Sequence, residues 1–386
     1  MTAQWTFYVC EVTTGRLVAE LPLVNVSAQR HLKRGTFSAD LPLGLAGDPD
    51  ATEFDRFHAQ QAQLRELLQT TTPAKYSIVV DRDGTPLGEW IIWQRTRGNP
   101  TKLQGVEFGS LLGFQPMPGV TFSGVDQFTI AQYMAQVGFG PANVAGSSAV
   151  SIPTSLSGVL RDRTYEAGDS TMVLQRLDEL SDVDDGFDWT VEVQWVSIGG
   201  VRYISRTLQL SYPRAGMNRS IILDQPGPGG SGGAILGFDL QEDGTNLANR
   251  AMAFGSGDGL KKVIGVATNS ALITAGYPAM TAVATYSSVS VPATLNGHAR
   301  SLLSLSQSPE LPPTVTIRGD VEPEIGSYTL GDIVRVQVDP RPEYPDGYNE
   351  DVRIQGWTFT PGVGPEIVPL EITSILDMPG SDVAPS

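Results

Sequence analysis

The chain has 386 residues, a formal net charge of −16 and a single cysteine, Cys10. This length allows two to four domains that each bury a core, and the negative charge argues against a nucleic-acid-binding surface, which needs a basic footprint. One cysteine excludes an intrachain disulfide, and no Cys/His cluster has the spacing of a zinc site.

Residues 1–120 alternate between short apolar segments and turns. Within residues 50–70, apolar residues recur at the spacing of one helical face, and Pro73 lies just past the end of this segment. We therefore predict a helix over residues 50–70. The strands predicted around this helix are Trp5–Val12, Leu17–Leu23, Phe37–Leu43, Tyr76–Asp81, Glu89–Thr96 and Lys102–Leu111. This order predicts an antiparallel β-barrel with one inserted helix.

Residues 121–200 have a different pattern. Apolar side chains at spacings of three and four predict a helix over Asp126–Phe139 and a second helix over Ser170–Val183, capped by Asp169 or Ser170. An acidic turn then leads into Phe187–Val196, where apolar residues alternate as in a strand. These elements predict an α+β domain.

Residues 201–310 begin with two predicted strands, Val201–Tyr212 and Ser220–Leu223. The glycine-rich run Pro226–Gly233 predicts a flexible connection. Beyond it the pattern predicts strands at Val263–Ala267 and Thr281–Tyr286 and a helix at Pro292–Ser306.

Three strands are predicted between Tyr328 and Ile372, followed by a mobile tail at Asp377–Ser386. The middle strand carries Val352 and Ile354 on one parity and Trp357 and Phe359 on the other, with Gly356 at the change of parity. A glycine at such a position is typical of a β-bulge. We therefore predict a bulge at Gly356.

Short motifs in three places resemble one family. The run Leu330-Gly331-Asp332-Ile333-Val334-Arg335-Val336, followed after a loop by Val352-Arg353-Ile354-Gln355-Gly356-Trp357, resembles the end of the hub proteins at the tips of long-tailed phages. Those are the gp27-like baseplate hubs and the minor tail proteins of actinophages. The strand Leu103–Phe108 is similar to one near the end of their first barrel. The helix, acidic turn and Gly186-Phe187-x-Trp189 are similar to their middle part.

The resemblance implies a β-rich α+β fold with two antiparallel β-barrels of the tube type and two inserted α+β domains. The first barrel would span residues 1–120, and the second, discontinuous barrel would span 201–225 plus 311–374. The inserted domains would be 121–200 and 226–310, and 375–386 would be the flexible tail.

The resemblance also implies a function. The chain would be a structural, non-enzymatic hub or minor tail protein, located at the virion tail tip and made in the host cytoplasm. It would form a homotrimeric ring that joins the distal tail protein and tail tube to a central fibre or spike, or to the tape measure protein. DNA would pass through the lumen without specific binding, and no cofactor or metal is implied.

The start of the chain and its hydropathy bear on location. Met1–Trp5 has no basic segment followed by an apolar one, so we expect no secretory signal. No uninterrupted run of about 18 apolar residues occurs, so we expect no membrane anchor and a soluble protein. Cys10 lies in an apolar strand and is expected to be a small buried residue.

A tail-associated hydrolase is the main alternative. Gly229-Gly230-Ser231-Gly232-Gly233 satisfies the Gly-x-Ser-x-Gly pattern of a serine nucleophile. The chain has three histidines, His31, His58 and His298. In the chain order of the α/β-hydrolases the set would be Ser231, Asp239 and His298. In the chymotrypsin order it would be His58, an aspartate and Ser231. His58 and His298 lie in predicted helices and no βαβ alternation surrounds Ser231, so the pattern favours a glycine-rich connection. A carboxylate pair of the glycosidase type stays open.

Two further groups of residues admit a binding function. The acidic turn contains Asp182, Asp184, Asp185 and Asp188, but it lacks the twelve-residue calcium loop, so a solvated turn is favoured. Trp189, Trp195 and Trp357 lie at strand positions and favour core packing over a platform for stacking sugars. A receptor- or carbohydrate-binding β module is therefore a further alternative.

Overall fold

The computed structural model describes residues 3–42, 65–140, 148–166, 168, 170–183, 185–225, 233–240, 244–287, 289–304, 306, 313–361 and 366–375. Residues 65–70 are helical, and the rest of the helix expected at 50–70 lies outside the described residues, as do most of the glycine-rich connection and the tail. None of the described helices is both long enough and apolar enough to span a membrane.

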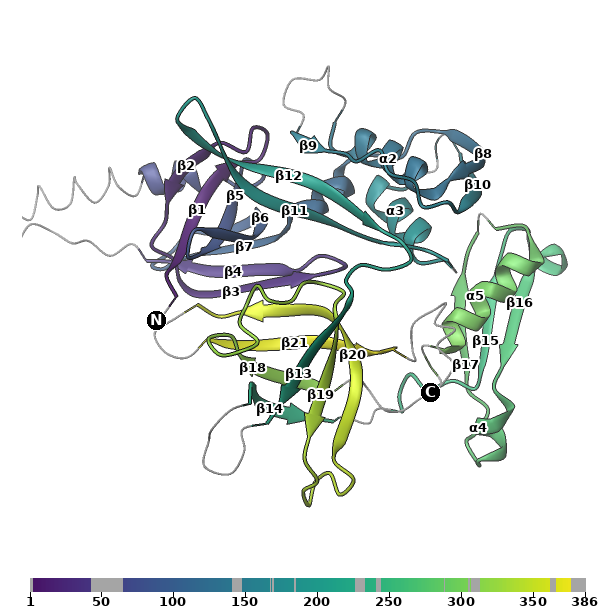
Figure 1. The fold of residues 1–386 in the computed structure, drawn as a ribbon. Coiled ribbons are helices and arrows are strands. Elements are labelled where there is room, and N and C mark those ends of the chain that lie inside the picture. The colour runs from purple at the N-terminus through teal and green to yellow at the C-terminus, as the bar shows by residue number, and fades with distance from the viewer. Residues whose placement is uncertain are drawn as a thin grey trace, which may run out of the picture.

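Strands from both ends of the chain join in one thirteen-stranded sheet (Figure 1). Its N-terminal half is antiparallel, in the order β3-β4-β7-β6-β5-β1-β2. These strands are β1 (Trp5–Glu11), β2 (Leu17–Glu20), β3 (Val24–His31), β4 (Thr36–Leu41), β5 (Tyr76–Arg82), β6 (Thr85–Thr96) and β7 (Thr101–Glu107).

The C-terminal half of the sheet continues from β3 through β20, in the order β20-β21-β18-β14. β19 pairs antiparallel with β20, along the edge of β20 opposite to β21. β19 also pairs in parallel with β13. These strands are β13 (Asn218–Asp224), β14 (Ile235–Asp239), β18 (Thr314–Arg318), β19 (Ile333–Val338), β20 (Tyr348–Phe359) and β21 (Ile367–Ser374). The β-rich architecture is confirmed, and the described strands do not close into a barrel.

The bulge predicted at Gly356 is confirmed. The register between β20 and β21 shifts between Ile354 and Gly356. Because one extra residue reverses the parity, Val352 and Ile354 before the bulge and Trp357 and Phe359 after it are all buried in the same core. The bulge also lets β20 leave β19 and pair with β3 from Gly356 to Phe359.

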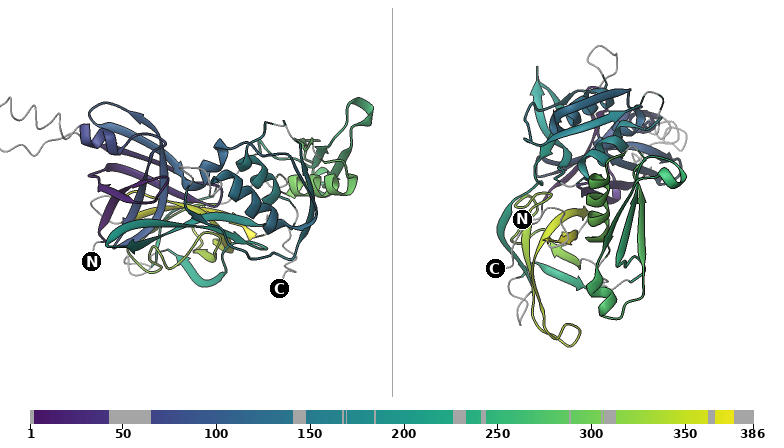
Figure 2. Two further views of the ribbon diagram at one scale, coloured as in Figure 1. Left: turned by 90° about the horizontal axis from the view of Figure 1, so that it is seen from above. Right: turned by 90° about the vertical axis from the view of Figure 1, so that its right-hand side faces the viewer.

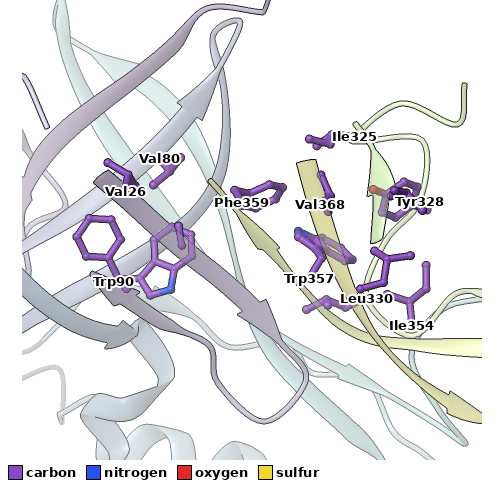
Figure 3. Packing of buried hydrophobic residues seen from close by; sticks show 14 of the residues in the cluster. Val26, Val80, Trp90, Ile325, Tyr328, Leu330, Ile354, Trp357, Phe359 and Val368 are labelled. Atoms are coloured by element: carbon purple, nitrogen blue, oxygen red, sulfur yellow. The ribbon is translucent and has the colours of Figure 1, made fainter. Parts of the chain in front are cut away.

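One hydrophobic core extends through both halves of the sheet. Figure 3 shows Phe359 between Val26, Val80 and Trp90 of the N-terminal half and Trp357 and Val368 of the C-terminal half. The ring centroids of Trp357 and Phe359 lie 6.2 Å apart, a T-shaped contact. The halves are therefore joined by side-chain packing as well as by the β20–β3 ladder.

A layer of helices and short sheets covers the N-terminal half. The predicted helices are found as α2 (Gln127–Gly138), capped by Asp126, and α3 (Val173–Ser181). The cap expected at Asp169 or Ser170 is wrong, because α3 begins after Met172 without a side-chain cap. The layer also contains the strands β8 (Val120–Asp126), β9 (Val150–Ser151), β10 (Leu160–Tyr165), β11 (Asp188–Ile198) and β12 (Val201–Ser211).

Residues 244–304 form a small module of their own. Its sheet has the order β16-β15-β17, and its helix α5 is the one predicted near Pro292. The elements are β15 (Arg250–Phe254), β16 (Ile264–Thr268), α4 (Ser270–Thr274), β17 (Thr281–Thr285), α5 (Pro292–Ser304) and the 3-10 turn Gly259–Lys261. Figure 1 shows the module standing to one side of the large sheet.

Several pairings differ from the sequence expectation. β14, expected in the inserted segment, pairs with β18 in the large sheet. β12, expected in the second barrel, pairs with β11 instead. The strand expected at Lys102–Leu111 ends at Glu107 and continues as the 3-10 helix Phe108–Phe114. Hydrophobic alternation shows which residues are extended but not which strand lies alongside.

Candidate functional site: the ionic junction under the β11–β12 hairpin

The β11–β12 hairpin lies over the N-terminal half of the sheet, and its base lies against the C-terminal half (Figures 1 and 2). The two strands pair without a register shift, and Gly199 and Gly200, with φ of 59° and 80°, form the turn. Four charged contacts fix the hairpin to β3, β5, β6 and β20. We call these contacts the ionic junction.

The deepest contact of the junction joins Arg206 on β12 to Glu89 on β6, each about 1% exposed. Nε and Nη2 of Arg206 donate to the two carboxylate oxygens of Glu89, both at 2.7 Å, and Nη1 donates to the Val12 carbonyl at 2.8 Å. The guanidinium carbon lies 4.1 Å from the centroid of the Phe108 ring. Two-point pairing with extra partners offsets the desolvation of both charges, so removing either one leaves an uncompensated charge in the core.

A second contact joins three strands through Arg30 on β3, which is 4% exposed. Its Nη2 donates to Glu192 on β11 at 2.9 Å, and its Nε lies 3.1 Å from Glu107 on β7. Burial raises the pKa of Glu107 above its ordinary value, against the opposing effect of Arg30. Burial acts to lower the pKa of Arg30, but Glu192 and Glu107 hold it above its ordinary value. Glu192 and Glu107 therefore keep the charged Arg30 side chain in place between the hairpin and the sheet.

A third contact lies near the tip of the hairpin. The indole Nε1 of Trp195 donates to Asp81 on β5 at 2.6 Å, and Arg202 lies 3.6 Å from the same carboxylate. The Arg202 guanidinium also lies 4.0 Å from the centroid of the Trp195 ring. This cation–π contact and the shared carboxylate fix the tip on the N-terminal half.

The base of the hairpin is fixed to the C-terminal half by Asp188 and Arg353. Arg353 on β20 is 4% exposed and donates through Nη2 to Asp188 and to the Ala215 carbonyl. The Asp188 carboxylate also accepts the Ala215 N–H at 2.7 Å. Burial lowers the pKa of Arg353 from its ordinary value, with Asp188 acting in the opposite direction. The contact joins the start of β11, the segment after β12 and the middle of β20.

A close backbone crossing lies beside this contact, between Gly216 and Gly331, whose φ angles are 83° and 88°. A Cβ on Gly216 would lie 2.0 Å from the Gly331 carbonyl carbon, so neither position accommodates a side chain. The adjoining Asp332 is fully buried and accepts the Met217 N–H at 2.9 Å and Arg219 Nε at 3.0 Å. The Gly331-Asp332 motif therefore has a structural role, holding β13 against β19.

Sequence reasoning missed the ionic junction, although a signal existed. Arg206 shares its strand parity with the buried Ile204, Leu208 and Leu210. In the same way, Arg30 follows Val26 and Ala28 on the apolar parity of β3. A charged residue on the apolar side of a strand indicates a buried partner. The sequence does not identify that partner.

The residues of the hydrolase hypothesis are not brought together. Ser231 and His58 lie outside the described residues. His298 is in α5 of the module and stacks on Tyr286 with 4.0 Å between ring centroids, whereas Asp239 ends β14 in the large sheet. Cys10 is fully buried, and burial raises the pKa of its thiol. This environment disfavours a reactive thiolate.

The candidate binding residues are used within the fold. Asp182 pairs with Lys33 and Asp188 with Arg353, while Asp184 lies outside the described residues. No set of three or more His, Cys, Asp or Glu side chains in the described part of the chain is arranged to hold a metal ion. The tryptophans Trp189 and Trp357 are buried in cores, and Trp195 packs against Tyr8.

The sequence matches no family model and no curated protein. Solved structures match it over nearly its whole length. The 43 kDa tail protein of prophage MuSo2 from Shewanella oneidensis is 11% identical, with a TM-score of 0.58 over 97% of this chain and 100% of that one. The tail protein from Neisseria meningitidis is 13% identical, with a TM-score of 0.57 over 96% of both chains. At these identities the likeness shows a shared fold.

Proposed function

We propose that this chain is a structural protein of a phage tail tip, a hub or minor tail protein. The observation that supports this most strongly is the fold shared with two tail proteins over almost the full length of all three chains. A match over nearly the whole length of both chains is more specific than a match to one common domain. The role is structural rather than catalytic.

The two halves of the large sheet would act as two tube-type units in each subunit. Three subunits would then present six such units around a central axis, which suits a joint between a hexameric tail tube and a three-fold fibre or spike. The ionic junction supports this role, because four buried or half-buried charged contacts hold the hairpin against both halves and resist bending between them.

A ring of this kind would mate with the distal tail protein and tail tube on one side and with a central fibre, spike or tape measure protein on the other. The chain carries 42 acidic and 26 basic residues. A lumen lined by such a surface would repel phosphates, so DNA would pass through it without binding.

The mass of the purified full-length protein tests the proposal. Light scattering at several concentrations near neutral pH should give three times the chain mass of 41.3 kDa, and negative-stain images should show rings with a central opening. A particle of two subunits, or an open filament, would contradict the trimeric hub. A monomer with hydrolytic activity that is lost in Ser231→Ala would instead favour the hydrolase.

A further inference from the structure

The module of residues 244–304 has a sheet with one covered face and one open face. Ala251 and Ala253 of β15 are buried beneath α5, while the alternate residues Met252 and Phe254 lie on the opposite face. The buried core of the module consists of Ala251, Ala253, Leu295, Ala299 and Leu303. Three of these five residues are alanines, so burial within the module contributes little stability for its size.

The open face carries an exposed apolar row. The strand register places Met252 opposite Val266 on β16 and Val283 on β17, and Phe254 opposite Ile264. The exposed fractions are 43% for Ile264, 42% for Val266 and 60% for Val283. Adjacent exposed apolar residues on a flat sheet face are typical of an interaction surface.

β17 forms an edge of this sheet, because it pairs with β15 alone among the described strands. Its sequence, Thr281–Thr285, has no charged residue and no proline. Charged residues, prolines and bulges are the usual features that keep a free edge from pairing with another chain. The open face and an unprotected edge therefore lie side by side.

The charge of the module is opposite to that of the chain. Residues 244–304 contain four basic residues and one acidic residue, Asp258, in a chain of net charge −16. Arg250 lies at one end of the apolar row, and Lys262 lies at the other, with Nζ 5.8 Å from the centroid of the Phe254 ring. An apolar centre with a cationic rim fits an acidic partner.

The chain itself presents such a partner. The β19–β20 hairpin projects from the C-terminal half of the sheet (Figure 1). Its exposed carboxylates are those of Asp339, Glu343, Asp346 and Glu350, and Arg341 is the one basic residue between them. A two-stranded hairpin is narrower than the three-stranded face, since neighbouring strands lie about 4.8 Å apart. The hairpin can therefore lie across the row with its acids facing the cationic rim, while its Tyr344 and Tyr348 stay packed against Phe238 of their own subunit.

We propose that the open face of the module binds the acidic β19–β20 hairpin of a second copy of this chain. The contact joins two different surfaces, so it closes into a ring when the rotation between copies allows closure. It deepens the proposed function, on which it rests, because it names the surfaces through which subunits associate. The complementary charges also make association weaken as salt rises.

Charge reversal on each side of the contact tests the proposal in the full-length protein. Arg250→Glu with Lys262→Glu reverses the module, and Glu343→Lys with Asp346→Lys reverses the hairpin. Each double variant alone should lose at least about tenfold in self-association by analytical ultracentrifugation, because like charges now face each other. Lys75→Glu with Lys102→Glu makes the same change in net charge as the module reversal, at exposed residues just before β5 and on β7, and should associate as the parent does.

An equimolar mixture of the two reversed variants gives the sharpest result. In the mixture an intact hairpin of one variant meets the intact module of the other, and the acidic reversed module meets the basic reversed hairpin, so opposite charges face each other at every contact and association should be restored. All substituted residues are exposed or half-exposed, and unchanged thermal unfolding confirms that each variant is folded. Assemblies that contain both variants in the mixture, with monomers in each variant alone, support the proposal.

Other outcomes overturn the proposal or separate it from the tail-hub function. A trimer that persists in both variants overturns this contact and leaves the hub function standing. Parent protein that associates through these surfaces into dimers or filaments supports the contact and contradicts the trimeric hub. Parent protein that stays monomeric at every concentration, or variants that associate no better when mixed, would overturn the contact.

Discussion

The ionic junction and the module of residues 244–304 differ in how they treat charge and apolar surface. In the junction, charged side chains such as Arg206 and Glu89 are fully buried and paired at 2.7 Å within a large core. In the module, the cations Arg250, Lys261 and Arg300 are exposed, and the buried core is mostly alanine. One region is closed within the subunit, whereas the other leaves apolar surface for a partner.

This difference indicates that the two regions have different roles in the same chain. A buried, fully paired junction fixes the relative position of the two sheet halves, and a change there affects the subunit as a whole. A module with a small separate core and an open face can gain stability from association. Stability should therefore be concentrated in the junction, and association in the module.

Glu89→Ala should give the largest loss of stability. It removes the carboxylate that meets two nitrogens of Arg206 and leaves that cation without its main partner in the core. The expected loss is about 3 to 5 kcal/mol in the free energy of unfolding, measured by urea denaturation. Arg335→Ala is the matched control, because its pair with Asp351 is 46% and 35% exposed and should contribute at most about 1 kcal/mol. Similar losses in the two variants would contradict the distinction between buried and exposed pairs.

The sequence allowed local structure to be predicted better than the junction. The helix over Asp126–Phe139 and the bulge at Gly356 were predicted correctly, because periodicity and a change of parity are local signals. The strand β3 was missed, because Val24–His31 contains several polar residues and faces the core through Val26, Ala28 and Arg30. Its burial depends on β20, more than 300 residues away, which no local pattern indicates.

The same limit applies to the site. Arg206 and Glu89 are 117 residues apart, and their pairing depends on how the β11–β12 hairpin lies over β6. The parity of Arg206 alone indicates a buried charge, but hydrogen-bond partners are set by the tertiary fold. For the module, the excess of basic residues can be counted from the sequence. The open face cannot be found from the sequence, because alternation predicts two faces of a strand without showing which one a helix covers.

Leu295→Ala should have a smaller and more local effect. Leu295 is fully buried in the five-residue core of the module, and its truncation should cost about 3 kcal/mol there. Because that core is separate from the core of the large sheet, hydrogen exchange should rise in β15–β17 and stay unchanged in β3 and β20. Leu103→Ala, in the core of the large sheet, should do the reverse. Faster exchange in both regions of both variants would show that they unfold as one unit.

Asp126→Asn should have the smallest effect and the clearest pH dependence. Asp126 caps α2 in the covering layer, and its carboxylate accepts the N–H groups of Phe128, Ser157 and Gly158. Burial acts to raise the pKa of this carboxyl, but these hydrogen bonds hold it below the ordinary value near 3.8. Because the folded pKa is lowered, the added stability is complete above that ordinary value and is lost as the pH falls through the lowered one.

The variant should therefore be less stable than the parent by about 1 kcal/mol at pH 7, and the difference should shrink at low pH. Thermal unfolding of parent and variant from pH 7 to pH 2.5 measures this difference directly. Asp162→Asn removes an equal charge from an exposed residue of β10, whose carboxylate accepts one backbone N–H, that of Gly124, and should therefore lose less stability than Asp126→Asn. In the module the corresponding cap of α4 is Asn269, which does not titrate, so exchange in α4 should show no such pH dependence. A pH-independent difference for Asp126→Asn would mean that the cap acts through shape rather than charge.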